Sequence, residues 1–189
     1  MKQDIYYTAL CTYDSENKEG FSWNDYIDWS ELKHLKELVS LDGNLNSLAF
    51  SLDIDAAEEW NYFITDHDMV MFYFSSLDYV LSKTDHLERF NLLAIIKEPG
   101  KEKANLNKDY NFIGYDLIEI GGNTSALTNC GGFDETFLPN DLNSYGLVSD
   151  YDSAKQIREA LPINNPDEPH VNCYLYEVWR HKTIGAKTN

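Results

Sequence analysis

Two short apolar runs constrain the fold of this chain more than any other feature. Residues 69–74 (Met-Val-Met-Phe-Tyr-Phe) are continuously apolar. Residues 90–97 (Phe-Asn-Leu-Leu-Ala-Ile-Ile-Lys) are nearly so, and Pro99-Gly100 stops that run. Short runs without alternation are typical of strands buried on both faces. The sequence therefore predicts a sheet whose central strands are covered on both sides.

Three further segments carry strand signals. Residues 4–13, 112–120 and 172–179 are rich in Tyr, Ile, Val and Leu, which favour strands. Residues 47–52 are consistent with one more short strand. From Gly121 to Asp150 the chain has little periodicity and many Gly, Asn, Asp and Ser residues, so we expect a long loop there.

Helices are indicated by caps and by apolar stripes. Ser22 with Asp25 forms a capping pair, and an apolar stripe follows it as far as Gly43. Asp55 with Glu58 repeats the capping arrangement. Shorter helices are predicted around Leu77–Leu81 and over residues 153–161, the latter between a cap at Asp152 and a break at Pro162.

These elements interleave irregularly, and no repeat or Pro/Ser linker divides the chain. The sequence therefore predicts an α+β fold, with a single globular domain over residues 1–189 and a mixed β-sheet flanked by several helices.

The net charge of −17 comes from two stretches, 37–82 and 109–154, that contain no Lys or Arg. They hold nine and eight acids, and the rest of the chain is neutral. A magnitude of about 2–8 suffices for the solubility of a small domain. A negative field attracts basic partners and repels nucleic acid and anionic membranes. The alternative explanation of the charge is a general enrichment of acids in the source organism. Such an enrichment would lower the number of Lys and Arg residues along the whole chain and not only in two stretches.

Acids and aromatic side chains interleave within the first stretch, which makes it the best candidate for a binding surface. Aromatic anchors ringed by carboxylates suit a Lys- and Arg-rich partner. A capped helix with its aromatics in the core is the alternative, and loop acids of the second stretch supply a second patch. The candidate partner-binding residues are Asp53, Asp55, Glu58, Glu59, Trp60, Tyr62, Asp66, Asp68, Asp134, Glu135 and Asp141.

Other chemistry has weaker support. Cys130 is a candidate nucleophile with His170 as its base, but no complete catalytic set is visible. The Gly-rich segment 121–132 lacks the lysine of a phosphate-binding loop. The cluster Asp66-His67-Asp68 supplies too few convergent ligands for zinc. We therefore predict no catalytic residue, no metal and no cofactor.

The three cysteines, Cys11, Cys130 and Cys173, do not suggest a disulfide framework. The first residues lack a signal sequence, and no apolar run approaches a membrane span. We expect a cytoplasmic protein.

In size, charge, aromatic content and expected location, the chain resembles the immunity proteins that neutralise bacterial toxins. The resemblance rests on residues 37–82 and 109–154 as charge-bearing regions. It implies an acidic inhibitor that occludes the active site of a basic, nuclease-like toxin, with no binding to nucleic acid or membrane. The alternatives are a small hydrolase or transferase using Cys130, a nucleic-acid mimic that binds a DNA-binding protein, and a subunit that buries its acids against a basic chain.

Overall fold

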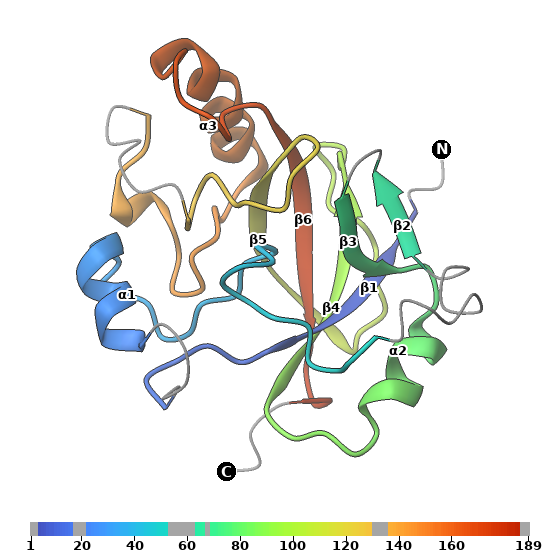
Figure 1. The fold of residues 1–189 in the computed structure, drawn as a ribbon. Helices are drawn as coiled ribbons and strands as arrows, with labels where there is room; N and C mark the ends of the chain where they lie inside the picture. Colours follow the sequence, from blue (N-terminus) through green and yellow to red (C-terminus); the bar gives the residue numbers. More distant parts are fainter. Residues whose placement is uncertain (1–3, 17–21, 53–62, 67–68, 130–135, 186–189) are drawn as a thin grey trace.

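A computed structural model describes residues 4–16, 22–52, 63–66, 69–129 and 136–185, with the backbone alone at 63–66 and 69–72. Within these ranges six strands form one sheet, in the order β2-β3-β1-β4-β6-β5 (Figure 1). The strands are β1 (Tyr6–Cys11), β2 (Phe63–Asp66), β3 (Met69–Phe74), β4 (Phe90–Lys97), β5 (Tyr110–Glu119) and β6 (Cys173–His181). The α-helices are α1 (Trp23–Ser30), α2 (Leu77–Thr84) and α3 (Tyr151–Asn164), and a 3-10 turn, η2, spans Pro139–Asp141.

The predicted α+β class and single domain are confirmed, but the predicted mixed sheet is wrong. Every pair of neighbouring described strands is antiparallel. The prediction of a mixed sheet came from the irregular interleaving of the predicted strands and helices, which does not fix the direction in which neighbouring strands pair. Strand β4 is buried over Phe90–Ile96 because both faces of this antiparallel sheet are covered. Helices cover one face of the sheet, and irregular chain covers the other.

Helices α2 and α3 pack on the same face of the sheet, at different places. Val80 of α2 joins a buried cluster with Ala9 and Leu92. Ala154, Ile157 and Leu161 of α3 pack in a cluster with Leu117 and Leu175. The strand registers place Ala9, Leu92, Leu117 and Leu175 on one face.

Irregular chain covers the opposite face. Val39, Leu41 and Leu147 pack there in one cluster with strand residues that include Leu93 and Val178. These covering residues lie in coil between α1 and β2 and between β5 and α3. The long region between Gly121 and Asp150, predicted as a loop, is therefore partly core: Ala126, Leu127, Leu142, Leu147 and Val148 are buried.

Helix α1 begins where the sequence predicts and ends much earlier. The Ser22 hydroxyl accepts from the Asp25 N–H at 3.2 Å, as a cap does. The helix ends at Ser30, where Glu31 adopts a left-handed φ of 60°. Beyond Ser30 the chain is irregular, yet Leu32, Leu35 and Leu38 are buried. The apolar stripe therefore correctly indicated which side chains are buried, but it did not indicate a helix.

Other boundaries also shift. The cap of α3 is Asp150, which accepts from the Ser153 N–H at 2.9 Å, rather than Asp152, and Pro162 lies inside the helix. Residues 47–52 form an isolated bridge, Leu48 to Leu10, instead of a strand. Strand β2 was not predicted from the sequence. The helix predicted after Asp55 lies outside the described residues. None of the described helices combines the length and apolar composition needed to cross a membrane.

Gly114 marks an irregularity in β5 that only glycine fits. Its φ is 145°, and a Cβ would lie 2.6 Å from Leu147 Cβ. The substitution Gly114→Ala is expected to lower the free energy of unfolding by about 3 kcal/mol, through backbone strain and overpacking. Gly121→Ala is the control, because φ is 79° there but no atom lies within 4 Å of the added Cβ. Urea denaturation measures both. Equal losses would contradict the packing argument.

Candidate functional site

The two acidic stretches meet over one face of the sheet. The Val39 N–H donates to Tyr145 O at 3.0 Å, and the Gly43 N–H donates to Asn123 O at 3.0 Å. Figure 1 shows the chain after α1 crossing the face of the sheet next to the segments between β5 and α3. In the described residues, therefore, the start of the first stretch runs beside the second.

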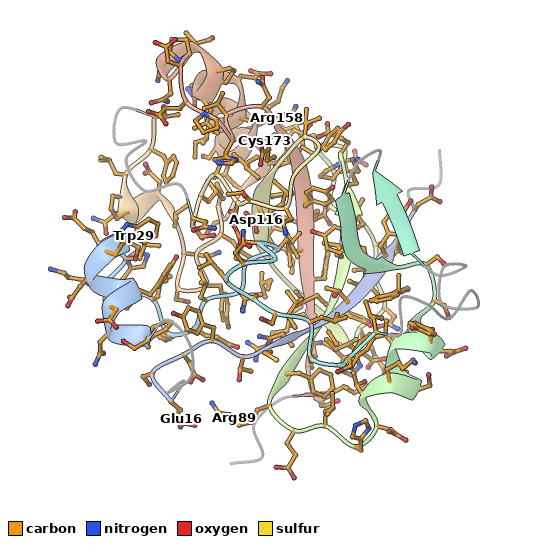
Figure 2. The ribbon with its side chains drawn as sticks, in the orientation of Figure 1. Glu16, Trp29, Arg89, Asp116, Arg158 and Cys173 are labelled. Carbon is orange, nitrogen blue, oxygen red and sulfur yellow. The ribbon has the colours of Figure 1, made fainter. Side chains whose placement is uncertain are left out.

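The buried carboxylate of Asp116 joins these segments (Figure 2). Its Oδ2 accepts from the Leu41 N–H at 2.8 Å and from the Ser40 hydroxyl at 3.3 Å. Its Oδ1 accepts from the Ser125 hydroxyl at 2.6 Å and from the Leu117 N–H at 2.8 Å. Burial raises the pKa of this carboxyl, and the hydrogen bonds from Ser125, Leu41 and Leu117 oppose the rise. Asp116 thus ties strand β5 to both covering segments.

Asp42 extends the same network and is also fully buried. Its Oδ1 accepts from the N–H groups of Asn44 and Leu45, at 2.7 and 3.1 Å. Its Oδ2 accepts from the Ser125 N–H at 2.8 Å and from the Asn129 amide at 3.0 Å. A carboxylate that receives several N–H bonds fixes the loops that supply them. Asp42 is therefore a structural residue.

Glu37 makes a third inward contact. Its Oε2 lies 2.8 Å from Arg180 Nη1, and its Oε1 accepts from the Asn91 amide at 2.7 Å. The Glu37 side chain is only 13% exposed. Together with Asp42 and Asp116, it shows that part of the negative charge of the two stretches is directed into the molecule.

Other acids of the second stretch hold local structure. Asp150 caps α3, and hydrogen bonds from Ser153 lower the pKa of its carboxyl. Asp152 lies 2.6 Å from Lys101 Nζ. Asp141 accepts from the Leu138 N–H at 2.7 Å and closes the turn η2.

Most of the predicted partner-binding residues lie outside the described residues, so the predicted surface stays a prediction. Within the described part, Asp66 ends β2, where its Cα partner is Met69. Asp141 is exposed and has the capping contact given above. The predicted residues outside are Asp53, Asp55, Glu58, Glu59, Trp60, Tyr62, Asp68, Asp134 and Glu135.

Helix α1 presents an acid–aromatic pattern that the sequence analysis did not single out. Trp29 is 48% exposed, while Tyr26 on the inner side of the helix is fully buried. Asp25 and Asp28 are exposed on the same helix. With Tyr26 and Ile27 on the inner face of α1, the period of the helix places Trp29 outside that face. The periodicity of the sequence could therefore have indicated that Trp29 is exposed. Trp29 is labelled on α1 in Figure 2.

All three arginines of the chain are in ion pairs with carboxylates. Arg89 lies 3.2 Å from Asp14 Oδ1 and 3.1 Å from Glu16 Oε2, beside the labelled Glu16 in Figure 2. Arg158 lies 2.8 Å from Glu98 Oε1. With Arg180 bound to Glu37, the planar donors that best grip phosphate are engaged within the protein.

His170, the base proposed for Cys130, is held by an acid. Its Nδ1 lies 2.6 Å from Glu119 Oε2, and it has a left-handed φ of 65°. The buried Cys173 is the strand partner of Glu119, and its thiol donates to the His170 carbonyl at 3.1 Å rather than to the ring. Cys130 itself lies outside the described residues, so the cysteine-dependent alternative stays a prediction.

Among the described residues, no group of three or more His, Cys, Asp or Glu is placed to hold a metal ion. The chain matches no family model, no curated protein and no solved structure. Only the geometry and charge of this chain therefore bear on its function.

Removal of the Asp116 carboxylate tests whether the network holds the covering segments. The substitution Asp116→Ala is expected to lower the free energy of unfolding by about 3 kcal/mol, because buried donors at Leu41 and Ser125 lose their acceptor. Urea denaturation measures the loss. Asp167→Ala, at an exposed position, is the control and should change stability by less than about 0.5 kcal/mol. Similar small effects would contradict a central role for Asp116.

Glu177 on β6 is a further buried acid. Its Oε1 accepts from Trp179 Nε1–H at 2.6 Å and from the Ala104 N–H at 3.0 Å. Its Oε2 is buried and has no hydrogen-bond partner among the described residues. Burial raises the pKa of this carboxyl above its ordinary value of 4.5, against the opposing hydrogen bonds. Its ionised form is therefore disfavoured in the folded state.

This raised pKa sets a pH dependence of stability. The folded form binds the Glu177 proton more tightly than the unfolded form, so stability is lost as pH rises from 4.5 through the raised pKa. The substitution Glu177→Gln removes this loss, so the variant should gain stability relative to the parent between about pH 4 and pH 8. Urea denaturation across that range measures the difference. Glu159→Gln, on the exposed side of α3, is the control. A difference in unfolding free energy between Glu177→Gln and the parent that does not grow with pH would contradict the raised pKa of Glu177.

Proposed function

We propose that this protein is an acidic inhibitor that binds a basic protein, in the manner of immunity proteins that neutralise bacterial toxins. The partner is a cytoplasmic or imported enzyme with a cationic active site, such as a nuclease. The inhibitor acts in the cytoplasm and binds neither nucleic acid nor membrane.

One observation carries this proposal: the engagement of every arginine within a chain of net charge −17. Lys101 and Lys155 also face carboxylates, at 2.6 and 3.6 Å. The basic groups that would attract phosphate are thus partly neutralised by carboxylates of the same chain. The excess carboxylates keep the long-range field negative, and this field speeds encounter with a cationic surface.

Aromatic anchors complete the surface. Charge steers association, whereas buried aromatic and arginine contacts supply most of the affinity at a protein interface. Trp60 and Tyr62 are the anchors expected in the first acidic stretch. On α1 the exposed Trp29, beside Asp25 and Asp28, offers a described example of the same pattern.

The mechanism is occlusion. Carboxylates take the positions that substrate phosphates occupy on the toxin, and one or two aromatic side chains fill its substrate pocket. Such an inhibitor needs no catalytic residue of its own. Its association rate should fall with added salt, because mobile ions screen the attraction over about 10 Å at 0.1 M.

A charge reversal in the first acidic stretch tests the proposal. Proteins of the native source are passed at low salt over the immobilised parent and over the double variant Glu58→Lys with Asp66→Lys. The parent should retain a basic protein at equal stoichiometry and abolish its activity. The variant should bind it at least about tenfold more weakly, because attraction becomes repulsion. Surface plasmon resonance with the purified partner measures both affinities.

The matched control is Asp167→Lys with Glu168→Lys, which makes the same change of charge in the exposed turn after α3. This control should retain the affinity of the parent to within about threefold, since distant charges are screened. Equal affinity of the parent and the first variant would remove residues 53–68 from the binding surface. A retained partner that stays fully active when saturated would overturn the inhibitor function.

A further inference from the structure

One pocket in the described residues differs in charge from the rest of the molecule. It has a volume of about 470 Å³ and lies at the end of the sheet where β5 begins and β6 ends. Asn111, Phe112 and Ile113 of β5 form one side, and Arg180, His181 and Lys182 form the other. Tyr145 of the covering coil completes the lining, which contains no Asp or Glu.

The two cations of this pocket are held in place by the protein. Arg180 Nη1 lies 2.8 Å from Glu37 Oε2, and the guanidinium carbon of Arg180 lies 5.9 Å from the centre of the Tyr145 ring. A guanidinium has five N–H donors, so others remain for a ligand. Lys182 Nζ donates to the carbonyl of Lys108, which leaves two of its three donors.

The His181 side chain lies on the opposite face of β6 from Arg180, where its ring packs against that of Tyr110 at 5.1 Å between ring centres. Its Nδ1 accepts from the N–H groups of Ile184 at 3.0 Å and Thr183 at 3.3 Å. A ring nitrogen that accepts hydrogen bonds carries no proton, so the proton of the neutral ring lies on Nε2. Burial lowers the pKa of this imidazole, and Asp109 opposes the shift. His181 is therefore uncharged and adds no positive charge beside the pocket.

Cationic donors and an apolar wall together define a ligand class. Arg180, Lys182 and Asn111 line this pocket together with Ile113 and Tyr145. Pockets of about 300–1,000 Å³ with a few convergent polar groups are typical of small-molecule sites. We propose that this pocket binds a small organic anion. Its carboxylate or phosphate lies on Arg180 and Lys182, and its planar apolar part lies against Tyr145 and Ile113.

The negative charge of the whole protein opposes the binding of anions to this pocket. A molecule of charge −17 repels anions at long range, so binding depends on local donors. Two nearby acids reduce the positive potential: Glu37 pairs with Arg180, and Asp109 acts on His181. We therefore expect a dissociation constant of about 1 mM for a ligand of about ten heavy atoms.

Titration with three aromatic probes tests the inference. Benzoate and phenyl phosphate separate the two anionic groups, and benzamide is the neutral isostere of benzoate. Amide chemical shifts of the ¹⁵N-labelled protein report binding at Asn111, His181 and Lys182. At least one anion should shift these amides with saturation, and benzamide should bind about tenfold more weakly. Equal binding of benzamide and benzoate, or no saturable shift with either anion, would overturn the proposal.

Two variants and a control locate the site. Lys182→Glu should weaken anion binding by about tenfold or more, and Lys182→Gln by less, since a charge-assisted hydrogen bond is lost in each. Lys182 is exposed, so both variants should keep the parent spectrum outside the pocket. Lys155→Glu makes the same charge change on α3 and should alter binding by less than about twofold. Equal weakening by Lys182→Glu and Lys155→Glu would show a non-specific charge effect and refute the site.

Discussion

The hydrogen bonds received by the buried carboxylate of Asp116 hold the irregular half of the structure against the sheet. Strand β5 supplies the acid, and the donors come from Ser40 and Leu41 on one segment and Ser125 on another. Asp42 repeats the arrangement from the opposite direction, since it receives the Ser125 N–H and the Asn129 amide. Segments without helix or strand have few backbone bonds of their own, so buried side-chain acceptors satisfy their donors. The apolar face of Leu93 and Val178 stays covered as a result.

In this architecture part of the negative charge is buried and does not face solvent. A sequence of net charge −17 suggests that its carboxylates face solvent, yet Glu37, Asp42 and Asp116 point inward from the two acidic stretches. The three arginines are also paired, because each meets a carboxylate of the same chain. The negative field outside and the cation-lined pocket at Arg180 and Lys182 are therefore separate features of one molecule. The first suits a basic protein partner, and the second suits a small anion.

The accuracy of the sequence predictions depended on the range of the interactions behind them. The start of α1 was predicted correctly because Ser22 and Asp25 cap it within four residues. Its end was misplaced because Leu32, Leu35 and Leu38 are buried as coil by distant partners. The predicted strands at 69–74 and 90–97 are β3 and β4, but their apolar runs did not reveal the antiparallel pairing. Of the predicted site, every residue but Asp66 and Asp141 lies outside the described structure, and the exposed Trp29 on α1 was not predicted.

Local and compositional signals in the sequence determined the α+β class, most of the strands, the capped start of α1 and the net charge. These depend on neighbours a few residues apart or on simple sums over the chain. Only the tertiary structure decided which acids are buried, which bases they meet and where a pocket forms. Asp116 and Leu41 are 75 residues apart, and Arg180 and Glu37 are 143 apart. Contacts at such separations depend on how the sheet and its covering segments pack, and no local pattern in the sequence encodes them.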